Sequence, residues 1–153
     1  MSSGDIRGLY FEQYKIGMEI TSQGRTITEA DISAFAGLSG DFNQIHTDEV
    51  YASATLFGQR VAHGLLVTSI VSGLAVQTGF MEGTVIAFRE ISQWKFSNPV
   101  FIGDTVTVAI KVTNTKKMPR INGGSVTFSL NVYNQNNSVV QHGAWVMLVK
   151  SQK

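Results

Sequence analysis

The sequence has no cysteine among its 153 residues. This absence excludes disulfides, thiolate nucleophiles and cysteine-ligated metal or iron–sulfur sites. Charged residues are also scarce, at 15% of the chain, whereas hydrophobic residues make up 43%. Because a soluble protein usually carries more charge, we expect a partner subunit to cover part of the apolar surface.

Clustered basic charge is missing too. The net charge is +1, and Lys116–Lys117 is the only pair of adjacent basic residues, so a nucleic-acid groove or a polybasic membrane patch is not expected. No apolar run reaches the roughly 18 residues of a membrane-spanning helix, and the N-terminus has no basic segment followed by an apolar one. These absences predict a soluble, cytoplasmic protein that binds neither nucleic acid nor membrane.

Helical signals are concentrated in the first half of the chain. Thr28 is a good N-cap, with acidic residues in the following turn, and glycines end that helix by residue 40. Thr47 is a second candidate N-cap, for a short helix that closes at Gly58. Residues 61–77 are apolar nearly all round and their polar members are small, which predicts a long helix buried on every side.

Strand signals follow in the second half. Residues 105–113 and 125–133 alternate between apolar and polar side chains, as strands with one buried face do. We expect further strands at 84–90, 92–97 and 139–150, and a short edge strand within 19–27. The sequence thus predicts one α+β domain over residues 1–153, with a helix against an antiparallel sheet of about five strands. Residues 1–9 are expected to form a loose tail.

A polar cluster between the predicted helices holds the candidate chemistry. Asp41 and His46 can converge if the chain turns between them, and Gly40 and Asn43 favour such a turn. A His paired with an Asp is suited to proton transfer near neutral pH. The spacing alone favours a solvated turn capped by a nearby His over a catalytic pair, and it does not decide between the two interpretations.

A second feature is His63–Gly64, at the start of the long apolar helix. First-turn N–H groups of a helix have no intrahelical partner, and the helix dipole favours negative charge beside them. Such an end can stabilise the developing oxyanion of a thioester carbonyl. His63 itself abuts an apolar helix, which favours a packing role over that of a base.

Taken together, these segments resemble the MaoC-like dehydratases, the family of (R)-specific enoyl-CoA hydratases. The family motif reads Gly, Asp, any residue, Asn, Pro, an aliphatic residue and His, and this chain has Gly40 to His46 in that order. It departs once, with Gln44 in place of Pro, which loosens the turn but removes no chemical group. The segments RVAHGLLVTSIVSGL and WKFSNPVFIGDTV are similar to later parts of the family, so the likeness spans roughly residues 28–149.

The resemblance implies a hot-dog fold, in which a curved antiparallel sheet wraps a long central helix. It also implies reversible hydration of a trans-2-enoyl-CoA, with Asp41 and His46 as the catalytic pair and Gly64 as the oxyanion donor. Asn43, Ser72 and His63 would support them. The substrate would be an acyl-CoA, with an acyl carrier protein as the alternative carrier, and neither a metal nor another cofactor would be required. The chain would assemble as a homo-oligomer, either a dimer or a dimer of dimers, with sheets joined edge to edge.

Two other functions remain open for the same fold. One is an acyl-CoA thioesterase, and the other is a non-catalytic acyl-CoA-binding subunit that has kept the motif. The acyl chain length depends on apolar residues lining the pocket, for which Leu65, Phe57 and Phe80 are the candidates.

Overall fold

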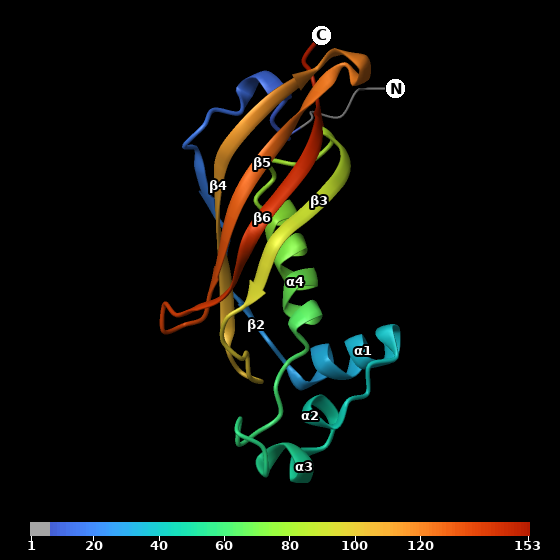
Figure 1. The fold of residues 1–153 in the computed structure, drawn as a ribbon, viewed down its shortest axis with the longest axis vertical. Helices are drawn as coiled ribbons and strands as arrows, with labels where there is room; N and C mark the ends of the chain where they lie inside the picture. Colours follow the sequence, from blue (N-terminus) through green and yellow to red (C-terminus); the bar gives the residue numbers. More distant parts are fainter. Residues whose placement is uncertain (1–6) are drawn as a thin grey trace.

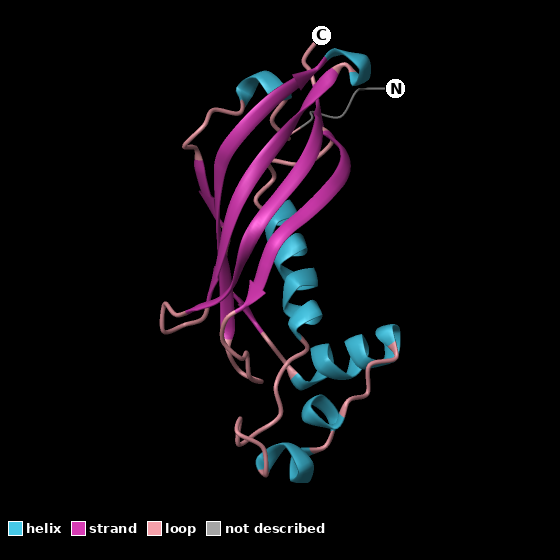
Figure 2. Ribbon diagram, in the orientation of Figure 1, coloured by secondary structure: helices cyan, strands magenta, loops and turns pink. Residues whose placement is uncertain are grey.

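A curved antiparallel sheet wraps around one long helix in the computed structural model, which describes residues 7–153 (Figure 1). The long helix is α4 (Gly64–Gln77), and three shorter helices lie beyond its N-terminal end: α1 (Glu29–Ser39), α2 (Gln44–Thr47) and α3 (Glu49–Ser53). Short 3-10 helices cover Phe11–Gln13 and Pro119–Ile121. The layers of helix and sheet, shown in Figure 2, confirm the predicted α+β architecture.

Within residues 7–153, six strands build the sheet. They are β1 (Glu19–Thr21), β2 (Arg25–Thr26), β3 (Val85–Phe96), β4 (Thr105–Met118), β5 (Gly123–Tyr133) and β6 (Val139–Lys150). Their order is β1-β4-β5-β6-β3, and β2 also pairs with β4, so the count exceeds the expected five by one. The two short strands predicted at 84–90 and 92–97 are a single strand, β3, whose pairing with β6 shifts register at three bulges.

The core lies between α4 and the concave face of the sheet. Alternation puts every second residue of β4, β5 and β6 on that face, where burial of apolar area is the main source of stability. The buried side chains of α4 are Leu66, Val67, Val71, Leu74 and Ala75, and those that face them include Val108, Ile110, Phe128, Leu130, Trp145 and Met147.

One face of α4 is exposed in the single chain, contrary to the prediction that this helix is buried on every side. Leu65 is 63% exposed and Val76 is 52% exposed, and the small residues Ser69, Ser72 and Gly73 lie exposed between them. The all-apolar pattern therefore reflects two apolar faces, of which the sheet covers only one.

Thr28 caps α1 as predicted, since its hydroxyl accepts a hydrogen bond from the Asp31 N–H at 3.2 Å. Gly40 ends α1 in the left-handed conformation, with φ of 78°, which glycine adopts at little cost. The predicted N-cap at Thr47 is wrong: Thr47 closes α2, whose N-cap is Asn43, and Asp48 caps α3. Two adjacent caps, each satisfying N–H groups locally, divide this segment into two short helices.

The predicted loose tail needs a further correction. Gly8 and Leu9 donate backbone hydrogen bonds to the carbonyls of Glu82 and Phe80, and Gly8 is buried. These two residues are therefore anchored beside the segment that joins α4 to β3. The remaining part of that prediction, residues 1–6, lies outside the described residues.

Candidate functional site

A turn between α1 and α2 brings Asp41 to the N-terminal end of α4. After Gly40, the Asp41 N–H donates to Ser39 Oγ at 3.1 Å, and Asp41 Oδ1 accepts from the Asn43 N–H at 3.1 Å. Asn43 Oδ1 in turn accepts from the Ile45 N–H at 3.3 Å. This chain of side-chain to backbone bonds fixes the turn and leaves Asp41 Oδ2 unused by it. Asn43 thus holds the turn in shape, although it does not contact the His46 ring by hydrogen bonding.

His46, on α2, is buried and its ring is fixed by a single strong contact. Its Nδ1 lies 2.7 Å from the carbonyl oxygen of Val61. Because a carbonyl oxygen only accepts, Nδ1 carries the proton, and Nε2 of the neutral ring has a free lone pair. That Nε2 lies 4.0 Å from Asp41 Oδ2. The gap is too long for a direct hydrogen bond but suits one molecule that bonds to both groups.

Burial lowers the pKa of His46 from its ordinary value of 6.5. The charge of His63 lowers it further, whereas the hydrogen bond to Val61 and the charge of Asp41 raise it; the net direction is down. His46 is therefore neutral at pH 7, which is the state that a general base requires.

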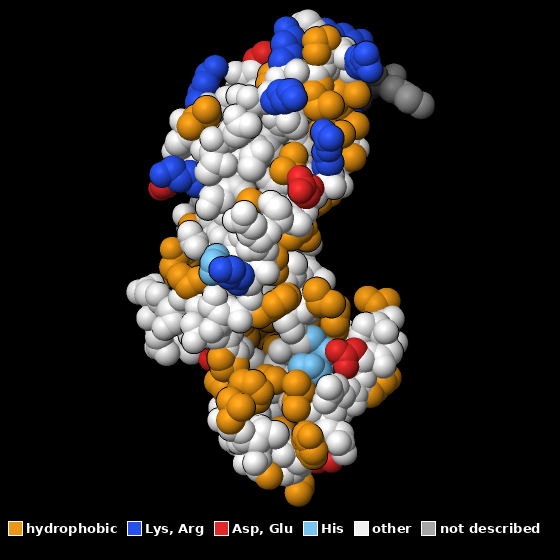
Figure 3. Space-filling view, viewed as in Figure 1, with side chains coloured by type: hydrophobic (Ala, Val, Ile, Leu, Met, Phe, Trp, Pro, Cys, Tyr) orange, Lys and Arg blue, Asp and Glu red, His pale blue; other side chains and the backbone are white. Residues whose placement is uncertain are grey.

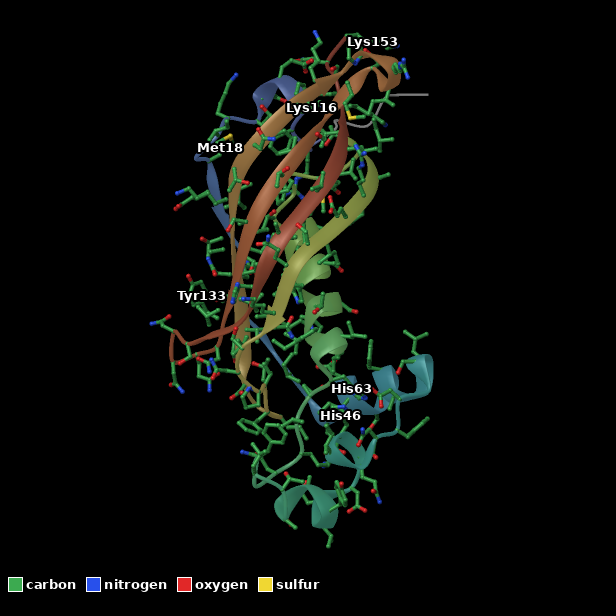
Figure 4. All side chains as sticks on the ribbon, in the orientation of Figure 1. Met18, His46, His63, Lys116, Tyr133 and Lys153 are labelled. Carbon is green, nitrogen blue, oxygen red and sulfur yellow. The ribbon has the colours of Figure 1, made fainter. Side chains whose placement is uncertain are left out.

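His63 stacks on the ring of His46, with the ring centroids 3.9 Å apart and the planes at 27°. Its Nε2 donates to the backbone carbonyl of Asp41 at 2.9 Å, which ties the turn to the start of α4. The ring of Phe35 packs edge-on against the ring of His63, with the ring centroids 4.9 Å apart. His63 thus contacts the ring of His46 and the backbone of Asp41, and the supporting role expected of it stays a prediction. Figure 4 shows the two labelled histidines together at the start of α4.

A cavity of about 460 Å³ opens beside His46. Its walls are mainly apolar, and its lining includes Phe57, Leu65, Phe96, Gly64 and Gln141. Of the predicted pocket residues, Phe57 and Leu65 line this cavity. Phe80 does not, because it is buried in the core against the rings of Tyr14 and Phe128. In Figure 3 one group of pale blue histidine atoms is visible next to a red acidic side chain, with hydrophobic side chains nearby.

The N-terminal end of α4 faces this cavity through Gly64. His63 is the N-cap, but its side chain caps no backbone N–H. The amides of the first turn therefore remain open to a bound group with negative charge. Gly64 has no Cβ because none fits: a Cβ here would lie 2.6 Å from the ring of Phe96. Phe96 can thus lie directly over the end of the helix.

Arg60 connects the small helices to each other. It donates to Glu49 of α3 at 2.8 Å and forms a two-pronged ion pair with Glu29 of α1, while its own side chain is mostly covered. Planar guanidinium geometry suits such bidentate contacts. Sequence patterns did not single out Arg60, because its partners lie in two separate helices.

Residues 12–134 match the family described as the MaoC like domain, which is most of the chain. The protein belongs to this family. Among its relatives, an (R)-specific enoyl-CoA hydratase of Rhodospirillum rubrum is 41% identical over 113 residues, covering 74% of this chain and 76% of that protein. A 3-hydroxybutyryl-CoA dehydratase of Methylorubrum extorquens is 36% identical over 109 residues, covering 71% of this chain and 66% of that protein.

Solved structures agree with the family. The unliganded (R)-hydratase PhaJ1 of Pseudomonas aeruginosa is 28% identical, with a TM-score of 0.79 over 95% of this chain and 88% of that chain. A Mycobacterium tuberculosis protein with a double hotdog fold is 17% identical, with a TM-score of 0.85 over 96% of this chain and 46% of that one. The second likeness concerns the fold alone, and with it the predicted hot-dog architecture is confirmed.

Within this MaoC-like domain, Ser72 does not meet the Asp41–His46 pair. It lies two turns along α4 from Gly64, is exposed, and donates to the Ser69 carbonyl at 2.6 Å. The resemblance implied that Ser72 supports the pair, but no contact within the described chain provides that support.

The side chains of Asp41, His46 and His63 each offer one ligand atom, and these atoms lie within 4.8 Å of one another. Each ring, however, uses one nitrogen on a backbone carbonyl. The remaining lone pairs lie in two stacked, nearly parallel planes, whereas a tetrahedral metal needs ligands that converge on one point. The geometry is therefore a poor fit to a shared metal ion.

None of the helices in residues 7–153 has the length and apolarity to cross a membrane.

Proposed function

We propose that this protein catalyses the reversible hydration of a trans-2-enoyl-CoA to an (R)-3-hydroxyacyl-CoA. One observation carries the proposal: the unused Asp41 Oδ2 and the free Nε2 of His46 face each other across 4.0 Å, beside an apolar cavity at a helix N-terminus. The relatives named as an (R)-specific enoyl-CoA hydratase and a 3-hydroxybutyryl-CoA dehydratase support the same chemistry.

In this mechanism one water bonds to both Asp41 and His46. As the water oxygen forms its bond to C3, its proton passes to the pair and the C2–C3 double bond shifts toward an enolate. The amide of Gly64 donates to the thioester oxygen, where the negative charge develops, and the helix dipole adds to its effect. The pair then returns a proton to C2 on the same face. Dehydration follows the reverse path, so atoms and charges balance in both directions.

The cavity would receive the acyl chain. Its apolar walls favour a hydrocarbon, whereas the charged phosphates of CoA would lose their water there and are expected to stay outside. The thioester would then lie at the mouth of the cavity, near Gly64. His46 and Gly64 both line this cavity, which supports the proposal that a base and an oxyanion donor act on one substrate.

Two substitutions test the proposal. We expect Asp41→Asn and His46→Gln each to lower kcat on crotonyl-CoA by about a hundredfold or more, as loss of a general acid or base does. The assay is the loss of the conjugated enoyl absorbance. An asparagine at 41 can still accept the Asn43 N–H, so the turn is retained.

Matched controls separate chemistry from damage to the fold. Asp48→Asn changes another acidic residue in the same helical segment, and His142→Gln changes a histidine on β6; both should leave kcat unchanged. Near-normal turnover in either test variant would contradict the assignment. Release of free CoA thiol by the wild-type protein would show a thioesterase instead, and ligand-induced stabilisation without product would show a binding subunit.

The functional form is proposed to be a homodimer that joins along β3. Among the described strands β3 pairs only with β6, so its other edge carries unpaired backbone groups. Exposed edges of this kind are hazards that proteins usually cover. Four large apolar side chains are exposed along β3, at 42% to 55%: Ile86, Phe88, Ile91 and Phe96. A second copy would extend the sheet and cover the exposed face of α4.

A further inference from the structure

The amide of Gln141, in the wall of the cavity, is buried, and both its oxygen and its nitrogen form hydrogen bonds. This residue of β6 is 2% exposed. Its Oε1 accepts from Trp94 Nε1 at 3.2 Å and from Thr68 Oγ1 at 2.8 Å, and its Nε2 donates to the Gly64 carbonyl at 2.9 Å. An indole N–H only donates and a carbonyl only accepts, so these two partners fix which end of the amide is which.

These bonds join three elements at the start of α4. Gln141 comes from β6, Trp94 from β3, and both Gly64 and Thr68 from the first turns of α4. The Thr68 hydroxyl also lies 3.1 Å from the Gly64 carbonyl, but its single hydrogen is shared with the closer Gln141 Oε1, so Gln141 Nε2 is the main side-chain donor to that carbonyl. Since a buried amide is costly unless paired, this arrangement has one orientation in which every polar atom is satisfied.

The first turn of α4 needs such a constraint. Its first residue is glycine, which has more backbone freedom than any other residue, and the side chain of its N-cap residue, His63, bonds to the Asp41 carbonyl and caps no N–H of the helix. Two side chains of the sheet contact it. Phe96 packs against Gly64, and Gln141 holds its carbonyl oxygen.

We propose that Gln141 is a positioning residue for the oxyanion site: it fixes the first turn of α4 so that the Gly64 amide stays aimed at the thioester oxygen. This inference rests on the proposed hydratase function. Charge develops on that oxygen mainly in the transition state, so a loosened donor affects the transition state more than the bound substrate. Loss of Gln141 should therefore lower kcat and leave KM nearly unchanged.

Two variants test this role. Gln141→Met keeps the length of the side chain and removes all its hydrogen bonds. Gln141→Glu keeps the acceptor for Trp94 and Thr68, removes the donor to Gly64, and serves as the second probe if the first variant folds poorly. For each we expect kcat on crotonyl-CoA to fall about tenfold to a hundredfold, less than or equal to the loss of a whole oxyanion donor, with KM within about threefold.

A spectroscopic measurement distinguishes an effect on the orientation of the Gly64 amide from an effect on the stability of the fold. In an Asp41→Asn background, in which turnover of bound crotonyl-CoA is slowed, the infrared stretch of the thioester carbonyl reports hydrogen bonding to its oxygen. With Gln141 present the band should lie below its frequency in solution, and in Gln141→Met it should move back toward that frequency. Met147→Ala, a cavity-forming change further along β6, is the control. It should lower Tm without moving the band or kcat.

The outcomes separate the two levels of inference. Wild-type protein that fails to consume crotonyl-CoA contradicts the proposed function itself. Active wild-type protein contradicts the role of Gln141 in three cases: if both Gln141 variants keep kcat within threefold, if their loss appears in KM alone, or if Met147→Ala shifts kcat and the carbonyl band equally.

Discussion

His46 illustrates how burial and one hydrogen bond set the state of a side chain. The Val61 carbonyl selects the tautomer, and burial makes the charged ring unfavourable. Because the pKa of His46 is lowered in the folded protein, the unfolded chain binds this proton at a higher pH than the folded one does. The resulting stability is fully present above the ordinary pKa of 6.5 and is lost as pH falls through the lowered value.

This linkage predicts that acid destabilises the wild-type protein more than a variant without His46. Between pH 7 and pH 5 the free energy of unfolding should fall more steeply for the wild-type protein than for His46→Gln, which cannot bind the proton. Urea denaturation at a series of pH values measures both slopes. Equal slopes would show that His46 does not take up a proton with the pKa shift that its burial implies.

Single residues of the site differ in how far sequence reveals them. Asp41, Asn43 and His46 lie in one short turn, so their grouping could be predicted from local spacing. Gln141 could not, because its partners Gly64 and Trp94 are 77 and 47 positions away in the chain. A lone polar residue in an alternating strand shows no pattern; only the tertiary fold reveals that it is buried.

At the scale of elements, α1 depends on its cap. The hydroxyl of Thr28 accepts the Asp31 N–H, and the Asp31 carboxylate accepts the Thr28 N–H at 2.9 Å. Thr28→Ala removes one of these bonds and should lower the free energy of unfolding by about 1 kcal/mol. Chemical denaturation measures this loss. Thr28→Ser keeps the hydroxyl and should recover most of the stability; a loss as large as that of alanine would place the effect outside the cap.

Element boundaries were predicted well where one strong signal acts alone. Thr28 at the start of α1 and the alternation in β4 and β5 are such signals. The sequence could not predict the division into α2 and α3, because Asn43 and Asp48 compete as caps with Thr47. It also could not join 84–90 and 92–97 into one strand, because irregular pairing with β6 interrupts the alternation of β3; at one of these irregularities Gln93 adopts a positive φ of 52°.

At the scale of the whole molecule, β3 should control assembly. Ile91→Lys and Phe88→Asp place charge on the exposed apolar strand and should shift the protein from dimer to monomer, because a charge there loses its water on association. Sedimentation velocity measures the change. Thr113→Lys, an added charge on β4 across the sheet from β3, should leave the dimer intact. A wild-type monomer at micromolar concentration would contradict the proposed assembly.

The composition favours a partner subunit, but it cannot tell which surface a partner would cover. The low charged fraction is a property of the whole chain, whereas the exposed face of α4 and the free edge of β3 emerge only when the strand order is known. The apolar pattern of α4 predicts a helix that is buried on every side. Periodicity does not show whether each face would contact the sheet or another subunit.

The strand order also determines when the domain can be completed during synthesis. Of the four long strands β3 is made first, yet its described strand partner is β6, which is made last. While β4 and β5 emerge and pair with each other, β3 and its exposed apolar residues remain without a neighbouring strand. Closure of this long-range contact is therefore slow, and nascent chains that end before β6 present an open apolar strand to chaperones or to aggregation.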